Sequence, residues 1–142
     1  MDRSEKSAFG ILYNPDSGRV LLHKRDEQAP INPSMWGLFG GAVESGEEPL
    51  QAWLRELHEE LGITSPPPQV RRLADYVTDR GTHRFVYLMP LRLRKGEMRL
   101  GEGEDFDWLA IDDAFNLALT SSTKKDLELF GELLRLSPSL LR

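Results

Sequence analysis

The chain has 142 residues, of which 39% are hydrophobic and 29% are charged, and its formal net charge is −5. This composition is typical of one globular domain that is large enough to bury a core, and it excludes an intrinsically disordered chain. The negative charge is unfavourable for nonspecific binding of nucleic acid. The absence of cysteine excludes disulfides, thiolate metal sites and cysteine nucleophiles.

No apolar run approaches the length of a membrane-spanning helix, and the polar first residues show no signal-peptide pattern. The sequence therefore predicts a single cytoplasmic domain over residues 1–142 that binds neither membrane nor nucleic acid. An anionic ligand would need a metal cation or a local basic pocket.

The first third of the chain reads as a hairpin, a loop and a glycine-rich strand. Two apolar runs, 8–13 and 19–23, flank a turn-forming segment and predict two paired strands. Residues 26–35 contain two prolines and no periodicity, which indicates a loop. Residues 36–43 carry three glycines among apolar residues, which favours a short strand with a sharply bent or closely approached backbone.

The clearest helical pattern spans residues 49–61. Pro49 suits the first turn, and Gly62 stands where a C-terminal cap is expected. The apolar side chains at helical spacing form a stripe that should face the core. They are Leu50, Trp53, Leu54, Leu57 and Leu61.

The rest of the chain is predicted to hold three strands and two helices. These are strands at 70–78, 84–93 and 105–111, a short helix at 112–117 and a last helix at 123–136. Arg80, His83 and Arg84 surround the turn between the first two of these strands and are expected to be exposed to solvent.

The acidic surplus is concentrated in one segment. Between Glu44 and Glu60 six acids accompany one base, Arg55, whereas the rest of the chain holds equal numbers of acids and bases. At about 100° per residue, Glu56, Glu59 and Glu60 share one sector of the predicted helix, where like charges repel. Arg55 can offset part of this repulsion, and a hard divalent cation such as Mg²⁺ can offset the rest. The alternative interpretation is a solvated acidic helix face without metal.

The spacing of the segment carries a family signature. It runs Gly41, five residues, Glu47, seven residues, Arg55-Glu56-Leu57, one residue, Glu59-Glu60, one residue, Gly62-Ile63. Over residues 41–63 this resembles the complete Nudix box of the Nudix (MutT-type) hydrolases. The resemblance covers most of the chain and implies an α/β fold, an α/β/α sandwich around a central mixed β-sheet.

The resemblance also implies residue roles. Glu56, Glu59 and Glu60 would ligate the metal, with the carbonyl of Gly40 as a further candidate. Glu47 and Arg55 would hold the loop and helix together, and Gly41 would be a supporting residue. The general base would be one of the helix glutamates or a later glutamate, Glu102 or Glu104, of which Glu102 is preferred. The catalytic set implied is therefore Arg55, Glu56, Glu59, Glu60 and Glu102.

The candidate substrate-binding residues are Arg25, Trp36 and Phe39. Arg25 would contact phosphate or pair with an acid, and Trp36 would stack on a base or serve as partly buried structure. Phe39 precedes the paired glycines, where many family members have proline. The run 36–41 resembles the oxidised-purine triphosphatase branch as well as other branches.

The activity that the resemblance implies is pyrophosphohydrolysis of a nucleoside diphosphate linked to another moiety, with Mg²⁺ as cofactor and Mn²⁺ as a substitute. A (d)NTP in a housecleaning role is the favoured substrate. A nucleotide-sugar hydrolase and a catalytically silent nucleotide-binding domain are the alternatives. The partner would be a small nucleotide, and the protein would be a monomer or a homodimer.

Overall fold

The structure is a computed structural model that describes residues 5–64, 69–101 and 105–141. In chain order its elements are β1 (Lys6–Tyr13), β2 (Val20–Lys24), β3 (Trp36–Gly37), β4 (Phe39–Ala42), α1 (Pro49–Leu61), β5 (Arg71–Val77), β6 (His83–Pro90), η1 (Lys95–Glu97), β7 (Asp105–Leu109), α2 (Ile111–Ala114), α3 (Ser121–Leu136) and η2 (Pro138–Leu141). The predicted linker at 65–68 lies outside the described residues.

The strands form one mixed sheet of seven strands with β1 in its middle. The order is β3-β2-β1-β6-β5, with β4 paired to β1 and β7 paired to β2. Along its whole length β1 runs parallel to β6, and on its other edge it is antiparallel to β4 and then to β2. The predicted hairpins at β1–β2 and β5–β6 are both present.

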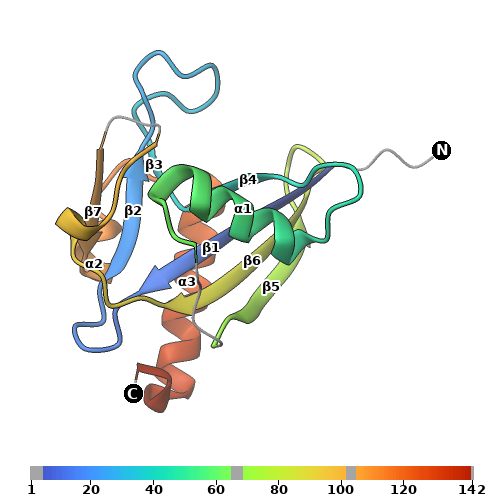
Figure 1. Ribbon diagram of the computed structural model, residues 1–142. Coiled ribbons are helices and arrows are strands. Elements are labelled where there is room, and N and C mark those ends of the chain that lie inside the picture. The colour runs from blue at the N-terminus through green and yellow to red at the C-terminus, as the bar shows by residue number, and fades with distance from the viewer. Residues whose placement is uncertain (1–4, 65–68, 102–104, 142) are drawn as a thin grey trace.

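Helices cover both faces of this sheet, with α1 in front of it and α3 behind it in Figure 1. Successive residues of β1 point to opposite faces, as strand geometry requires. Leu12 belongs to the core layer that Trp53 and the rest of α1 cover, whereas Ile11 belongs to the layer that Phe130 of α3 covers. The predicted α/β/α sandwich with a mixed sheet is therefore confirmed.

Close packing of α1 on β1 depends on a glycine. A Cβ atom on Gly10 would overlap the ring of Trp53, so only glycine allows the helix to approach this strand. The indole Nε1 of Trp53 donates a hydrogen bond to the Phe39 carbonyl oxygen at 3.1 Å, and its ring stacks on Tyr87. These contacts fix the helix relative to β1, β4 and β6.

The bounds of α1 agree with the prediction. Gly62 ends the helix in the left-handed conformation with φ 73°, and the side chain of Gln51 accepts a hydrogen bond from the Glu48 backbone N–H at 2.9 Å. Trp53 and Leu57 of the predicted stripe are buried, but Leu50 in the first turn is exposed.

The predicted strand at 36–43 is instead two short strands with different partners. β3 pairs with β2, and β4 pairs with β1. At Gly40 a Cβ atom would overlap the carbonyl oxygen of Ala8, so the crossing from one partner to the other requires glycine here. The last helix starts slightly earlier than predicted because the Thr120 side chain accepts a hydrogen bond from the Thr123 N–H and caps it.

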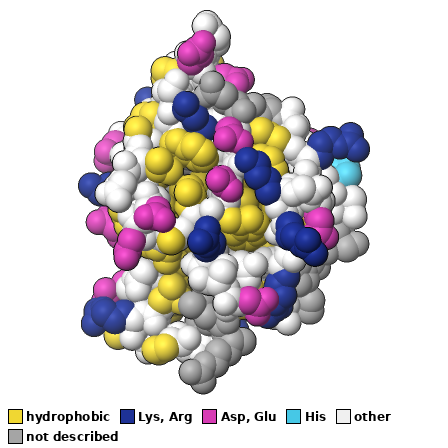
Figure 2. Space-filling view, turned by 90° about the vertical axis from the view of Figure 1, so that its left-hand side faces the viewer, with side chains coloured by type: hydrophobic (Ala, Val, Ile, Leu, Met, Phe, Trp, Pro, Cys, Tyr) yellow, Lys and Arg dark blue, Asp and Glu magenta, His cyan; other side chains and the backbone are white. Residues whose placement is uncertain are grey.

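The surface mixes apolar and charged side chains. Figure 2 shows, on the side of the molecule that carries β7 and α2, apolar side chains near the middle of the face with basic and acidic side chains of both signs around them. Within the described part of the chain, no helix has the length and apolar character that a membrane span requires.

Candidate functional site

Arg55, in the middle of α1, is the centre of an acidic network. Its Nε donates to Glu47 Oε2 at 2.8 Å and its Nη2 to Glu47 Oε1 at 3.1 Å, which is a bidentate ion pair. Its Nη2 also donates to the Ala42 carbonyl oxygen at 3.1 Å. Arg55 thus ties the helix to β4 and to the loop that joins them.

The same guanidinium reaches two more carboxylates. Its Nη1 lies 3.2 Å from Glu56 Oε1 and 3.3 Å from Glu59 Oε2, so one nitrogen gathers both helix glutamates. The hydrogen bonds from Arg55 hold the pKa of Glu47 below its ordinary value, and those to Glu47 raise the pKa of Arg55. Glu47 and Arg55 are therefore both charged at neutral pH.

The paired glycines allow β4 to lie against this network. A Cβ atom on Gly41 would overlap Oε1 of Glu56, so the bare backbone makes room for that carboxylate. Gly40, the preceding residue, pairs with Phe9 in the sheet. Gly41 is therefore needed where β4 faces α1, and Gly40 is needed where β4 lies against β1.

The remaining predicted acids lie at the far end of α1. The Glu59 side chain is 55% exposed, whereas Glu60 is buried. Gly101 packs against this end, because its N–H donates to the Glu60 carbonyl oxygen at 2.7 Å and a Cβ atom on it would overlap the Glu59 carbonyl oxygen. Glu102, the preferred late glutamate, and Glu104 lie outside the described residues.

The predicted metal ligands do not form a three-ligand cluster within the part of the chain that the structure describes. Among residues 5–64, 69–101 and 105–141, no three Asp, Glu or His side chains converge in a geometry that would hold a metal ion. Glu56 and Glu59 are directed at Arg55 instead, and Glu60 is buried. The donor set itself, hard carboxylate oxygens beside an exposed helix face, fits a cation such as Mg²⁺.

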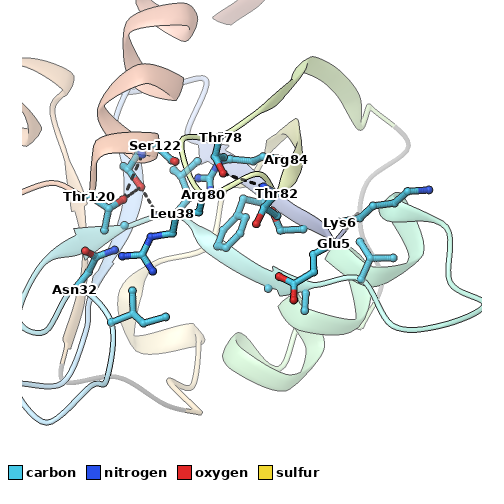
Figure 3. A pocket seen from close by; sticks show the side chains of 18 of the residues that line it. Glu5, Lys6, Asn32, Leu38, Thr78, Arg80, Thr82, Arg84, Thr120 and Ser122 are labelled. Atoms are coloured by element: carbon cyan, nitrogen blue, oxygen red, sulfur yellow. Dashed lines mark hydrogen bonds between the residues drawn. The ribbon is translucent and has the colours of Figure 1, made fainter. Parts of the chain in front are cut away.

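A cleft of about 960 Å³ lies beside this network, within the size range of small-molecule sites. One end is formed by residues 41–47, which include Glu47, and the other by residues 120–123 at the start of α3. Figure 3 shows side chains from several elements around it, with Thr120 and Ser122 of the α3 end and Thr78, Thr82 and Arg84 of the β5–β6 hairpin. The basic side chains in its lining are Lys6, Arg25, Arg80, Arg84 and Lys125.

Of the three predicted substrate-binding residues, only Arg25 lines the cleft. Its Nε donates to the Ile31 carbonyl oxygen at 2.8 Å, which holds the side chain along the loop at the cleft mouth. Trp36 packs into the layer under α3 and does not line the cleft.

Phe39 requires a correction. Its side chain has no exposed surface and stacks on His23 with ring centroids 4.6 Å apart. Because neighbouring strand residues face opposite ways, Leu38 lines the cleft while Phe39 points into the α1 layer. The structure therefore assigns Phe39 to the core and not to the substrate site.

Sequence reasoning missed a buried ion pair at the cleft. Arg84, expected to be exposed, has a side chain that is only 7% exposed and pairs with the fully buried Asp126 of α3. Asp126 stands between Thr123, Leu127 and Phe130 on the buried face of its helix. A single acid on an apolar helix face indicates that Asp126 is buried with a partner, but it does not identify Arg84 as that partner.

Comparison with known proteins gives consistent results. The sequence profile described as NUDIX domain matches residues 4–130. The chain is 30% identical over 132 residues to the nucleoside triphosphatase NudI of Escherichia coli, with 82% of this chain and 90% of that protein covered. It is 32% identical to a nucleoside triphosphate pyrophosphatase/Nudix hydrolase fusion protein of Bifidobacterium longum, of which it spans only 27%. Among solved structures, the MutT NUDIX hydrolase of Burkholderia pseudomallei is 30% identical with a TM-score of 0.69, and the match covers 90% of this chain and 98% of that one.

Proposed function

Because the chain belongs to the Nudix family of pyrophosphohydrolases, we propose that it hydrolyses a nucleoside triphosphate, with Mg²⁺ as its metal, to a nucleoside monophosphate and pyrophosphate. The observation that carries the proposal is the Arg55 network, which gathers Glu47, Glu56 and Glu59 next to a nucleotide-sized cleft. The similarity to proteins named nucleoside triphosphatase supports a triphosphate over a nucleotide sugar.

Glu56 and Glu59 would hold the metal, with Glu60 and the carbonyl of Gly40 as further ligands. The carboxylates of Glu56 and Glu59 lie close together because both accept hydrogen bonds from one nitrogen of Arg55. A divalent cation would bind the same carboxylate oxygens. When bound, Mg²⁺ polarises phosphoryl oxygens and lowers the pKa of a coordinated water. Arg55 and Glu47 then serve as positioning residues, because they fix α1 against the loop at 42–47.

Glu102 remains the proposed general base. Its neighbour Gly101 is hydrogen-bonded to the last turn of α1, one residue from Glu59 along the helix. Gly101, the residue before Glu102 in the sequence, therefore lies close to the proposed metal ligands, which supports the choice of the Glu102 carboxylate. Hydrolysis then needs only that this group accept the proton of the attacking water.

The basic lining of the cleft supports an anionic substrate. Lys6, Arg25 and Arg80 come from three different segments and belong to the lining of the cleft. Their charges favour a polyphosphate even though the chain as a whole is negative. The phosphates are proposed to lie between these side chains and the α1 carboxylates.

A phosphate-release screen tests the proposal. Nucleoside triphosphates, nucleotide sugars, ADP-ribose and dinucleoside polyphosphates are each incubated with Mg²⁺, with Mn²⁺ or with chelator, with pyrophosphatase or phosphatase added to convert the products to phosphate. We expect turnover of triphosphates that requires metal. Preferred hydrolysis of nucleotide sugars would show that the substrate is a nucleotide sugar and not a triphosphate. Binding of nucleotides without any turnover would indicate a catalytically silent domain.

A further inference from the structure

The buried pair Arg84–Asp126 leaves one edge of a guanidinium unused. Arg84 Nε donates to Asp126 Oδ2 at 2.9 Å and Nη2 donates to the same oxygen at 2.7 Å. Both donors belong to the side edge of the guanidinium. The end edge, formed by Nη1 and the second hydrogen of Nη2, is not engaged by Asp126.

Neighbouring groups hold this guanidinium in one plane. The hydroxyl of Tyr76 donates to the other Asp126 oxygen, Oδ1, at 2.6 Å, and burial raises the pKa of Tyr76, so the hydroxyl stays protonated. The ring of Phe9 lies 4.0 Å from the Arg84 guanidinium carbon. Three elements besides β6 therefore fix the orientation of Arg84.

The free edge of Arg84 belongs to the cleft. Nη1 makes no hydrogen bond or ion pair with any residue in the described ranges, and it is not among the nitrogen atoms sealed from solvent there. Arg84 lines the cleft together with Phe9, Tyr76 and Ser122. Figure 3 places Arg84 among the side chains around this space.

The pairing decides which ligand group suits this edge. Asp126 offsets the charge of Arg84, whereas Lys6, Arg25 and Arg80 line the same cleft without so close a buried counterion. A phosphate is better served by those three side chains. Two parallel N–H donors with an offset charge suit two adjacent neutral acceptors, and among bases the N7 and O6 atoms of guanine are such a pair.

We propose that Arg84, positioned by Asp126 and Tyr76, recognises the N7/O6 edge of a 6-oxopurine, so that the nucleotide substrate carries guanine or hypoxanthine. The inference rests on the proposed function, because it places the base of the substrate at the α3 end of the cleft. Adenine is disfavoured because its 6-amino group would face the donors of Arg84. 8-Oxoguanine is disfavoured because its N7 carries a hydrogen.

Substrate analogues test this in the wild-type protein. The enzyme is assayed with Mg²⁺ on dGTP, dITP, dATP, 7-deaza-dGTP and 8-oxo-dGTP. We expect dGTP and dITP to have similar kcat/KM, and the other three to be lower by about 10-fold or more, the usual value of a bidentate contact. Equal kcat/KM for dGTP and 7-deaza-dGTP, or a preference for 8-oxo-dGTP, would overturn the proposal.

Variants then assign the effect to Arg84. Arg84→Lys keeps the charge but loses the two parallel N–H donors of the guanidinium. We expect it to raise KM for dGTP and to abolish the difference in kcat/KM between dGTP and 7-deaza-dGTP. Arg92→Lys, at an exposed arginine paired with Asp16, is the matched control and should keep the difference. A purely structural role of Arg84 would lower activity on all bases equally and leave their ratios unchanged, which would reject the assignment.

Binding measurements separate this inference from the proposed function. Calorimetry with GMP, 7-deaza-GMP and AMP needs no turnover. If no nucleotide is hydrolysed but GMP binds about 10-fold more tightly than the other two, the proposed hydrolysis fails while the base recognition holds. If triphosphates are hydrolysed without any difference among bases, the proposed hydrolysis holds while the base recognition fails.

Discussion

Arg55 and Glu47 form a bidentate ion pair across the turn that leads into α1, with both guanidinium–carboxylate distances at or below 3.1 Å. Two parallel hydrogen bonds fix an orientation, which a single ammonium cannot do. The pair therefore sets the position of the loop at 42–47 relative to the helix glutamates.

Replacing Arg55 by lysine is expected to lower kcat/KM by about 10- to 100-fold, the usual cost of losing a group that orients metal ligands. The loss of part of the ion-pair network should lower the melting temperature only slightly, because water and salt screen ion pairs near the protein surface. Steady-state kinetics and thermal melts measure both effects. The control is Arg92→Lys, and unchanged turnover in Arg55→Lys would contradict a positioning role.

The proposed metal ligands are tested by removing one charge at a time. Glu59→Gln is expected to cut turnover by about 100-fold or more while the fold stays intact, because a carboxylate ligand of the metal is lost. Glu128→Gln, at an exposed position of α3, serves as the matched control. Magnesium should also raise the melting temperature of the wild type and do so less in Glu59→Gln.

The same metal titration applied to Glu60→Gln distinguishes a ligand from a structural group, because Glu60 is buried. Loss of turnover together with a weaker response to magnesium would identify a ligand. Normal turnover in both Glu59→Gln and Glu60→Gln would mean that the metal binds elsewhere.

Gly41 and Gly131 offer the same substitution with opposite expectations. In Gly41→Ala the new methyl group collides with the Glu56 carboxylate, so turnover should fall by about 10-fold or more as that side chain is displaced. In Gly131→Ala the methyl group meets nothing within 4 Å, and the helix should gain about 0.5–1 kcal/mol. Kinetics and melting temperatures of the two variants check this, and equal behaviour would refute the close approach at Gly41.

His23 predicts a pH dependence of stability. Burial lowers its pKa, partly opposed by its hydrogen bond to the Leu38 carbonyl oxygen at 3.1 Å, so the folded protein binds this proton less readily than the unfolded chain does. Above the ordinary histidine pKa of about 6.5, His23 is neutral in both states and does not lower the free energy of unfolding. As the pH falls below that value, the unfolded chain takes up the proton more readily, so the free energy of unfolding decreases.

Thermal melts between about pH 5 and pH 8 test this against His23→Gln, which keeps a donor for Leu38 but does not titrate in that range. The wild type should lose more stability toward acid than the variant. His58→Gln, at an exposed position of α1, should follow the wild type. Parallel curves for all three proteins would exclude His23 as the responsible group.

Local stereochemistry explains which elements the sequence predicts well. The limits of α1 are marked by Pro49 and Gly62, whose backbone preferences act within a few residues. The exchange of partners between β3 and β4 depends on two strands elsewhere in the sheet, so a pattern of residues 36–43 cannot reveal it.

The same distinction applies to the site. The spacing of Arg55, Glu56 and Glu59 along one helix predicts that they meet, and they do. Arg84 and Asp126 are 42 residues apart and belong to different elements, so no local pattern connects them. Whether Phe39 or its neighbour Leu38 reaches the cleft depends on which face of the sheet each side chain occupies, and only the assembled sheet decides that.

The parallel pairing of β1 with β6 has a consequence for the order of folding. Residues 6–13 meet residues 83–90 along the middle of the sheet, so this edge of β1 stays open until most of the chain is available. Closing so long a loop is slow, and an unpaired strand edge is prone to pair with other molecules. During synthesis this edge of the apolar strand β1 therefore stays unpaired until residues 83–90 have been made. Fragments that end before His83 are expected to aggregate.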